Sequence, residues 1–598
     1  MAANLQPIAL PPGRLTGIAS AFSLAELRAD LRAQAQAAAE RMQLTLAEAI
    51  CVEAIRGYWG SLTEKFPLRE PPRATCVLPE ALAATAWRLG EIMSPLPVSE
   101  AAYHLSLLYT GLLRPERRAK HGVYYTPPSL AGRLLDQAET AGLDWSKAHI
   151  LDPAAGAAAF LVPAAIRLMK SMASCAPAVT LQNISARIRG FEIDPFSAWM
   201  GQVFIEAAIM PVIVAANRKP ADLITVCDSL KVETRECFDL VIGNPPFGRV
   251  SLPAKQRERF ARGLYGHANL YGIFMDLAVH LARPGGLVSF LTPSSFLAGE
   301  YFKNLRSVLS REAPPVALDF VSHRKGVFED VLQETVLATY EKGTHEKGGR
   351  RTCAVVSFIH PQPGNPAVAV PAGCFTLPRK TSAPWVLPRH ADEEKLAKRL
   401  RSMPERLEDW GYKVSTGPLV WNRHRSQLRD EAGKGRIPLV WAESITSDGR
   451  FIFRSERRNH KPFFELQQDD DWLVVSTSCV LLQRTTAKEQ ARRLIAAEMP
   501  ASFVSPHGGV TVENHINMMV PTVAKPVVSP ALLAAFLNSV AADRAFRCLS
   551  GSVAVSAYEL ENLPLPSAAD FKALVGRKTD RAVIEKACLE LYDEGDES

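Results

Sequence analysis

The sequence predicts an α/β protein with a Rossmann-like, mostly parallel, doubly wound sheet, preceded by a helical region and followed by a mixed α+β region. Short apolar runs that end in a carboxylate and precede a helical stretch occur at 149–152, 188–192 and 223–228. A further apolar run, 238–242, leads into Asn-Pro-Pro-Phe at 244–247. Alternation of strand and helix favours a parallel sheet, whose ligand sites lie at the carboxyl ends of its strands.

The composition is that of a soluble globular protein: of 598 residues, 47% are hydrophobic and 22% charged. Length alone suggests about three or four domains. The ten cysteines include no Cys-x-x-Cys pair, so we expect no metal site and no disulfide framework, in a cytoplasmic setting. No signal peptide is recognisable, and the apolar run 207–216 is too short to span a membrane. The net charge of +7 permits a nucleic-acid partner.

The N-terminal region is rich in good helix formers. We expect a helix over Ser23–Tyr58, with a capping box formed by Ser23 and Glu26, and helical structure again over Glu80–Leu113. The segment 67–79 breaks the pattern. The basic patch that follows is either a solvated linker or a contact to phosphates, and it consists of Arg114, Arg117, Arg118 and Lys120.

The Asn-Pro-Pro-Phe segment is a stiff loop at the end of a strand. Two prolines have a fixed φ and no N–H, so the segment can neither join a ladder nor start an ordinary helix. The loop holds the Asn244 amide, the Pro245 carbonyl and the Phe247 ring. This set suits a planar base with an exocyclic amine, because the two oxygens accept the amine hydrogens and the ring stacks.

The carboxylates at the other strand ends suit a ligand with an adenosine and an amino-acid tail. Asp152 opens a turn of small residues and then a helix, without the Gly-x-Gly-x-x-Gly spacing of dinucleotide sites. Glu192 can accept hydrogen bonds from ribose hydroxyls, and Asp228 from an adenine amine. Thr126, in Thr-Pro-Pro before a helix, is either a helix cap or a lip over the cofactor.

The motifs occur in the order Tyr-Tyr-Thr-Pro, Asp-Pro-Ala-x-Gly, Glu-Ile-Asp-Pro, Asp-Ser and Asn-Pro-Pro-Phe. This order resembles the gamma group of S-adenosylmethionine-dependent DNA adenine-N6 methyltransferases, the TaqI-like and Eco57I-like modification enzymes of restriction–modification systems. The resemblance continues through 269–281, 284–296 and 327–335, and covers Gly122–Tyr340.

The resemblance implies a site-specific, adenine-specific DNA methyltransferase with S-adenosylmethionine as cofactor and an adenine flipped out of the duplex as acceptor. Phe328 matches an aromatic residue that packs on this base, together with Phe247. The implied catalytic residues are Asn244, Pro245, Pro246 and Phe247. The implied cofactor-binding residues are Thr126, Asp152, Ala154, Gly156, Glu192 and Asp228.

The turn after Asp152 departs from the family pattern. The family has Cys, Ser and a second Gly where this chain has Ala155, Ala157 and Ala158. If Ala158 needs a positive φ, it carries strain of ~1 kcal/mol or more, and the cofactor binds less tightly. We expect activity to survive because Asp152 and Gly156 are retained.

The C-terminal half mixes short strands, basic loops and aromatic residues. Next to a DNA methyltransferase, such a run indicates DNA contact, with a solvated face over an aromatic core as the alternative. The predicted DNA-binding residues are Arg423, Arg425, Arg429, Lys434, Arg436, Arg454, Arg457 and Arg458. His507 and His515 could suggest a metal site, but no Cys or carboxylate lies at the spacing of metal ligands from them, so we expect no metal there. The tail from Phe571 is expected to be a charged, solvated helix.

These observations predict four parts. Residues 1–118 form a helical region, 119–345 the methyltransferase domain, 346–404 a connecting segment and 405–598 the DNA target-recognition domain. Expected partners are double-stranded DNA and a separately encoded restriction endonuclease, and the protein is expected to be a monomer or dimer.

Three other functions stay open from the sequence. The first is a DNA-binding specificity protein with an inactive methyltransferase half, for which the altered turn argues. The second is a methyltransferase acting on RNA or on protein glutamine, against which the long segment after Leu407 argues. The third is a bifunctional restriction enzyme, although no nuclease motif is recognisable in the N-terminal helices.

Overall fold

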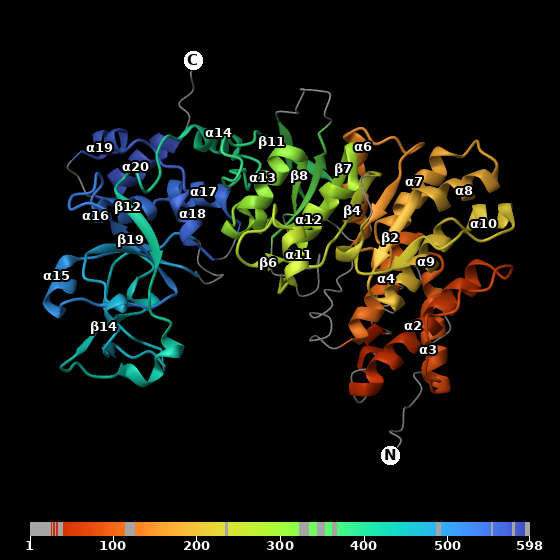
Figure 1. The fold of residues 1–598 in the computed structure, drawn as a ribbon, viewed down its shortest axis with the longest axis horizontal. Coiled ribbons are helices and arrows are strands. Elements are labelled where there is room, and N and C mark those ends of the chain that lie inside the picture. The colour runs from red at the N-terminus through yellow and green to blue at the C-terminus, as the bar shows by residue number, and fades with distance from the viewer. Residues whose placement is uncertain are drawn as a thin grey trace. The chain divides into compact units, whose positions relative to one another are not determined.

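The computed structural model describes residues 26, 28–29, 31–33, 40–73, 75–113, 126–233, 237–321, 334–343, 353–360, 367–457, 459–485, 492–551, 554–576 and 580–592. The chain forms two compact units, each described here by itself (Figure 1). The first comprises Met1–Pro293, Val308–Arg351 and Ile359–Ala369. The second comprises Ser294–Ser307, Thr352–Phe358 and Val370–Ser598. The division into four parts stays a prediction.

The sheet of the first unit confirms the predicted α/β class. Its strands follow one another in the order β8-β9-β7-β4-β1-β2-β3. Strands β3, β2, β1, β4 and β7 pair in parallel, and β9 runs antiparallel to β7 and β8. The bounds are β1 Ile150–Asp152, β2 Ile188–Glu192, β3 Ile224–Val226, β4 Phe238–Gly243, β7 Ala282–Pro293, β8 Pro315–Val321 and β9 Thr335–Glu341.

The register of these strands places the predicted site residues at one edge. Ile150 lies opposite Ile188 on one side and Leu240 on the other, so β1, β2 and β4 end at about the same level. Leu240 and Ile242 are fully buried, because helices cover both faces of a parallel sheet. The carboxylates and the Asn-Pro-Pro-Phe loop therefore meet, as the sequence predicts.

Helices connect the strands. They are α6 Pro128–Thr140, α7 Leu161–Ser171, α8 Pro177–Arg187, α9 Pro195–Ala208, α10 Met210–Ala216, α12 Leu270–Leu281 and α13 Lys303–Glu312. Helix α9 begins where the Asp194 carboxylate accepts from Ser197 N at 3.1 Å, with Pro195 in the first turn. Among the described residues, no single helix is long and apolar enough to cross a membrane; α9 and α10 meet that test only as a pair bent by 71°.

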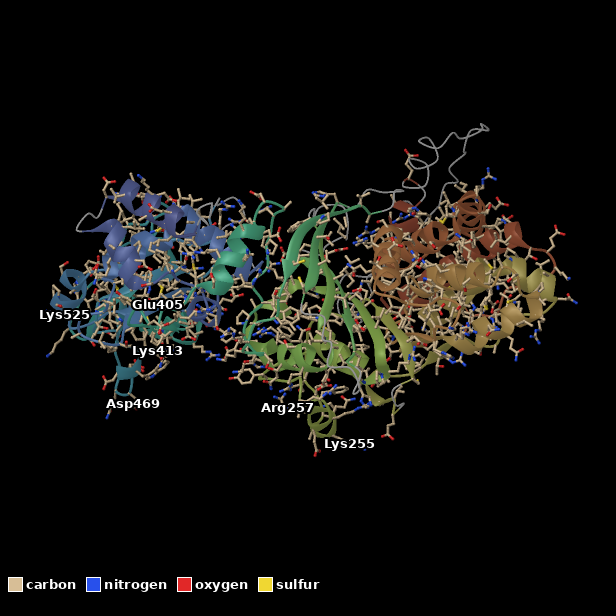
Figure 2. All side chains as sticks on the ribbon, turned by 90° about the horizontal axis from the view of Figure 1, so that it is seen from above. Lys255, Arg257, Glu405, Lys413, Asp469 and Lys525 are labelled. Atoms are coloured by element: carbon tan, nitrogen blue, oxygen red, sulfur yellow. The ribbon has the colours of Figure 1, made fainter. Side chains whose placement is uncertain are left out.

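A small lobe follows the Asn-Pro-Pro-Phe loop. It contains β5 (Arg249–Val250), α11 (Ala254–Arg259) and β6 (Ala268–Asn269), and β5 and β6 form a two-stranded antiparallel sheet. Lys255 and Arg257 on α11 lie at the outer edge of the first unit (Figure 2).

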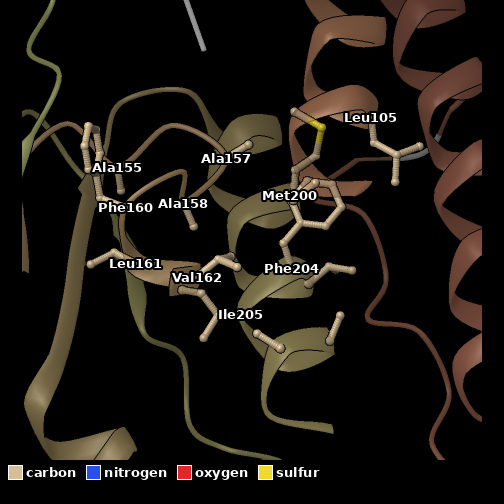
Figure 3. Close-up of a cluster of buried hydrophobic side chains, with 14 of the residues drawn as sticks. Leu105, Ala155, Ala157, Ala158, Phe160, Leu161, Val162, Met200, Phe204 and Ile205 are labelled. Atoms are coloured by element: carbon tan, nitrogen blue, oxygen red, sulfur yellow. The ribbon is translucent and has the colours of Figure 1, made fainter. Parts of the chain in front are cut away.

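The N-terminal helices pack on this unit. They are α2 Glu40–Leu62, α3 Glu80–Met93 and α4 Val98–Leu112. Helices α2 and α3 approach so closely that a Cβ on Gly90 would lie 1.9 Å from the Ala54 carbonyl oxygen. Tyr109 of α4 contacts Phe196 of α9, with ring centroids 4.9 Å apart. Figure 3 shows Leu105 of α4 with the buried side chains of α9 and of the turn after β1.

Helical structure over Glu80–Leu113 is interrupted between Met93 and Val98, because Pro95 and Pro97 lack the N–H that a continuous helix needs. Ser23 of the expected capping box, and the basic patch at 114–120, lie outside the described residues.

The second unit has the predicted mixed α+β character. One sheet has the order β12-β19-β16-β17, and another has the order β13-β15-β14-β18. The strands are β10 Ala354–Ile359, β11 Ala369–Phe375, β12 Tyr412–Thr416, β13 Leu428–Arg429, β14 Arg436–Val440, β15 Phe463–Glu465, β16 Cys479–Gln483, β17 Ala496–Met499, β18 Thr511–Val512 and β19 Ile516–Pro521. The helices are α14 Glu394–Ser402, α15 Ala501–Val504, α16 Pro530–Leu537, α17 Val540–Leu549, α18 Ala557–Glu561, α19 Ala568–Val575 and α20 Arg581–Tyr592.

The expectation of a solvated helical tail is wrong for the described part. The chain after Ser567 forms α19 and α20, which are separate helices. Phe571, Ile584 and Cys588 are buried, and Trp410 stacks on Phe571 with centroids 5.5 Å apart. The segment is rich in charged residues, but its apolar residues recur at helical spacing and form a stripe that packs into the core.

Candidate active site

A cavity of about 590 Å³ lies at the carboxyl ends of the parallel strands in the first unit. Small residues of the turn after β1 form one wall, and the Asn-Pro-Pro-Phe loop forms another. The predicted site residues that line it are Thr126, Ala154, Gly156, Glu192, Asp228, Asn244, Pro246 and Phe247. Asp152 and Pro245 are buried. The structure thus gathers residues that are far apart in the sequence.

Asp152 is buried at the end of β1. Its Oδ1 accepts a hydrogen bond from Ala154 N at 3.0 Å, while Oδ2 has no hydrogen-bond partner among the described residues. A Cβ on Gly243 of β4 would lie 2.7 Å from Oδ1, so the neighbouring strand closes over the carboxylate. Burial raises the pKa of Asp152 to about 8.

The turn of small residues after β1 contains two residues with a positive φ. Ala158 has φ = 64° and Gly156 has φ = 51°, both in the left-handed region. Ala158 is fully buried, and its N–H donates to the Ala155 carbonyl at 2.7 Å. The family has glycine at this position, so Ala158 carries the strain expected of a side chain there.

Glu192 joins β2 to this turn. One carboxylate oxygen accepts from Gly156 N at 2.8 Å, and the other from Asp194 N at 2.9 Å. Burial raises the pKa of Glu192 despite these two bonds. Each oxygen keeps a lone pair, so the carboxylate can still accept from a ligand in the cavity.

Asp228 lies at the end of β3. Its Oδ1 accepts from Leu230 N at 3.1 Å, which caps a short 3-10 helix, and its Oδ2 lies 3.2 Å from Lys231 Nζ. Ser229 Oγ donates to the Pro153 carbonyl at 2.5 Å. This bond ties the end of β3 to the turn after β1 across the floor of the cavity.

Asn244 has a free acceptor. Its Nδ2 donates to Thr126 Oγ1 at 3.1 Å, and its Oδ1 is buried without a hydrogen-bond partner among the described residues. Phe247 is half-buried, and the edge of Tyr271 meets it with ring centroids 6.1 Å apart and an interplanar angle of 80°. The loop therefore presents an amide oxygen and an aromatic ring beside the same cavity.

Several residues of the cavity had not been predicted. Ile193 is 64% exposed and lines the cavity directly after Glu192. Phe160, Cys227 and Phe274 line it as well. A large apolar residue that follows a strand-ending acid is a signal that could have identified Ile193, because a residue beyond the strand end is not needed in the core. Phe328 lies outside the described residues.

The basic residues of the second unit fall into two groups. Arg429 and Arg436 pair with Glu465, Arg454 pairs with Glu456 at 3.0 Å, and Arg457 lies 3.6 Å from Glu443. Arg423, Arg425 and Lys434 are exposed and have no acidic partner among the described residues. Arg425 lies over the Trp421 ring at 5.3 Å. Arg458 is outside the described residues.

Many of the interleaved aromatic residues belong to the core of this unit. Trp441 and Phe464 are fully buried, and His460 stacks on Trp441 with centroids 3.8 Å apart. No three His, Cys, Asp or Glu side chains cluster as they would around a metal in the described ranges.

The sequence is similar to those of known methyltransferases. The family model of the Eco57I restriction-modification methylase matches residues 197–328. The Type II methyltransferase M.BsuBI of Bacillus subtilis is 27% identical over 349 residues, covering 57% of this chain and 67% of that protein. The Type II methyltransferase M.PstI of Providencia stuartii is 27% identical over 335 residues, covering 55% of this chain and 65% of that protein.

A solved structure extends the likeness along the chain. The Type IIL restriction-modification enzyme MmeI, determined in complex with DNA, has a TM-score of 0.50 and 13% sequence identity, over 98% of both chains. At this identity the likeness concerns the fold. The matches to M.BsuBI and M.PstI span about two thirds of those relatives.

Proposed function

Because residues 197–328 match the family model of the Eco57I restriction-modification methylase, we propose that this chain is a restriction–modification methylase and that it methylates the N6 amine of an adenine flipped out of duplex DNA. The cofactor of this family is S-adenosylmethionine, which supplies a methyl group on a positively charged sulfur. The proposal includes a separately encoded endonuclease as partner and a monomer or dimer bound to DNA in the cytoplasm.

The cavity fits the cofactor. Its volume of about 590 Å³ lies within the range of small-molecule sites. Asp152 Oδ2 is buried and has no hydrogen-bond partner among the described residues, and Glu192 and Asp228 lie at the ends of the two neighbouring strands. Carboxylates suit the cationic amino-acid end and the ribose hydroxyls of the cofactor. Ala154 and Gly156 allow close approach of the ligand to the backbone.

The observation that carries the proposal is the Asn244 amide. Its Oδ1 is buried with no hydrogen-bond partner in the part of the chain that the structure describes, while its Nδ2 donates to Thr126 Oγ1, so the oxygen is oriented and available as an acceptor. An adenine N6 amine has two hydrogens to donate, which Asn244 Oδ1 and the Pro245 carbonyl accept. These acceptors stabilise the positive charge that develops on the nitrogen during transfer. Phe247 stacks on the base and Pro246 keeps the loop rigid.

A stacked base cannot reach this cavity. The acceptor adenine must therefore leave the duplex, at a cost of a few kcal/mol. Stacking on Phe247 and phosphate contacts offset this cost. In the second unit, the exposed Arg423, Arg425 and Lys434 are the strongest candidates for such contacts, because their charges are not neutralised by a described carboxylate.

Two alternatives fit less well. An inactive methyltransferase half would leave no reason for the unused acceptors of Asp152 and Asn244, and the turn keeps its left-handed conformation at Ala158. A methyltransferase of RNA or of protein glutamine would leave the mixed α+β second unit without a role.

The test is to express the chain in a host and to map modified bases in the host DNA. The proposal expects N6-methyladenine in one sequence context, and none from Asn244→Ala. Calorimetry should show that Asn244→Ala still binds S-adenosylmethionine. Modified cytosine, or unmodified DNA from a wild-type protein that binds no cofactor, would contradict the proposal. Turnover by Asn244→Ala close to the wild-type rate would remove the role of Asn244.

A further inference from the structure

The lobe that contains β5, α11 and β6, here called the basic lobe (residues 249–269), is connected directly to the Asn-Pro-Pro-Phe loop. Leu270 N donates to the Gly248 carbonyl at 2.9 Å across its base, where β5 and β6 also pair. The chain leaves the site after Phe247 and returns to it at Tyr271, and these two rings are in contact. The position of the lobe is therefore connected to the position of the loop that holds Asn244.

The basic lobe carries a net positive charge. Its single acidic residue is Glu258, and its basic residues are Arg249, Lys255, Arg257, Arg259, Arg262 and His267. A run of like charges without function is usually a solvated face. The structure separates the residues that hold the lobe in place from those that face outward.

Two arginines anchor the lobe to the first unit. Arg259 donates to the Leu230 carbonyl at 2.9 Å and to the Val232 carbonyl at 2.6 Å. Arg262 Nε donates to Asp276 Oδ1 at 2.7 Å, and its Nη1 pairs with Glu312 at 2.7 Å. With the paired strands at the base, these bonds attach the lobe at three points.

Lys255 and Arg257 are placed differently. Both are exposed, and neither is paired with a described carboxylate. Arg257 uses one Nη2 hydrogen bond, at 2.7 Å, to hold the Gly266 carbonyl, which leaves most of its donors available. Figure 2 shows both side chains directed away from the ribbon.

An open groove of about 510 Å³ lies on the lobe beside Arg257, and Lys255 lies outside its lining, two positions earlier on α11. Arg257, Ser251 and His267 line it. The segment 249–252 lines both this groove and the cavity of the active site. A polyanion in the groove would thus lie beside the position of a base in the cavity.

We propose that the basic lobe binds the sugar–phosphate backbone of DNA next to the extruded adenine, with Lys255 and Arg257 as the phosphate contacts. This inference rests on the proposed function for its DNA substrate. Phosphate contacts position a protein on the duplex, and here they do so on an element whose two ends pair beside the Asn-Pro-Pro-Phe loop. The contacts stabilise the flipped state without touching the reacting atoms.

The test compares wild type with the double variant Lys255→Gln/Arg257→Gln. Fluorescence anisotropy with a labelled mixed-sequence duplex, at several salt concentrations, measures the affinity for DNA. Loss of two phosphate contacts lowers the slope of log K against log salt by about 2 and weakens binding by about tenfold. With substrate DNA, KM rises while kcat at saturating DNA changes little.

The matched control is Lys170→Gln/Arg218→Gln, which also removes two exposed charges from the first unit. Lys170 lies in the last turn of α7 and Arg218 follows α10, and neither lines the cavity or the groove. The control should keep the wild-type slope. An unchanged slope and KM for Lys255→Gln/Arg257→Gln, in a protein with the wild-type thermal midpoint, would overturn the proposal and leave a solvated face.

The readouts keep the two proposals apart. Affinity for the mixed-sequence duplex does not depend on methyl transfer. If the wild type modifies no adenine but the lobe variant still loses salt-dependent affinity, the chemistry proposed for Asn244 fails and the DNA surface stands. If the wild type modifies adenine and the lobe variant binds DNA normally, the chemistry proposed for Asn244 stands and the DNA surface on the lobe fails.

Discussion

Asn244 donates a hydrogen bond from Nδ2 to Thr126 Oγ1 across 3.1 Å. These residues are 118 positions apart, and the contact fixes which end of the Asn244 amide is used as a donor inside the protein. Oδ1 is thereby left as an acceptor, and Thr126, predicted from the sequence as either a helix cap or a lip over the cofactor, orients the amide.

We expect Thr126→Val to lower kcat by about tenfold to a hundredfold, because small misplacements of a reacting group have effects of this size. Steady-state kinetics with DNA substrate measure it. Thr126→Ser keeps the hydroxyl and should restore most of the rate. If valine and serine variants behave alike, the hydroxyl does not position Asn244.

The strained turn makes a second prediction. Ala158 has φ = 64°, whereas Ala157 is not in the left-handed region. Both residues are buried, so a change to glycine removes one methyl group and adds unfolded-state entropy in each case. Only at Ala158 does the change also relieve strain.

Ala158→Gly should therefore be more stable than Ala157→Gly by ~1 kcal/mol, measured by chemical or thermal unfolding. We also expect Ala158→Gly to bind S-adenosylmethionine at least as tightly as wild type. Equal stability of the two glycine variants would mean that the backbone at Ala158 is not strained.

The strand ends could be predicted from the sequence because parallel strands place their carboxyl ends together. Asp152, Glu192 and Asn244 follow short apolar runs, and that rule alone brings them to the same end of the sheet, where Glu192 and Asn244 line the cavity. The family pattern has glycine at position 158, and this glycine is the reason to expect a positive φ and strain at Ala158.

Other features depend on contacts between distant parts of the chain. The pairing of Arg429 with Glu465 follows from the register of β13 against β15, which no local pattern specifies. The anchoring of Arg262 by Glu312 likewise joins residues 50 positions apart. A list of basic residues therefore cannot distinguish charges used inside the fold from charges available to DNA.

Asp152 predicts how stability responds to pH. Burial raises its pKa to about 8 in the folded protein, above an ordinary aspartate value of about 3.9. Between these values the folded state holds a proton that the unfolded state has lost. Stability therefore falls as pH rises through this window, by at most about 1.4 kcal/mol per pH unit, and levels off above about pH 8.

The measurement is the thermal midpoint from about pH 5 to about pH 8. Asp152→Asn has no proton to lose at this position and should show a flatter profile. Burial also raises the pKa of Glu192, so some decline should persist in the variant. Parallel profiles for wild type and variant would show that Asp152 ionises normally.

The two groups of arginines in the second unit make the last prediction. Arg423 and Arg425 are exposed without a described acidic partner, whereas Arg429 pairs with Glu465 and donates to the Ser426 carbonyl at 2.6 Å. We expect Arg423→Gln/Arg425→Gln to keep the thermal midpoint and to weaken DNA binding by about tenfold, with a salt slope lower by about 2. Arg429→Gln should instead lower the thermal midpoint, because it leaves Glu465 with one partner fewer, and should change the salt slope less.

Anisotropy and thermal unfolding on the same preparations separate the two effects. The opposite outcome, in which Arg429 carries the salt dependence and the exposed pair does not, would mean that DNA displaces Glu465 and that the ion pairs of the free protein are a resting arrangement.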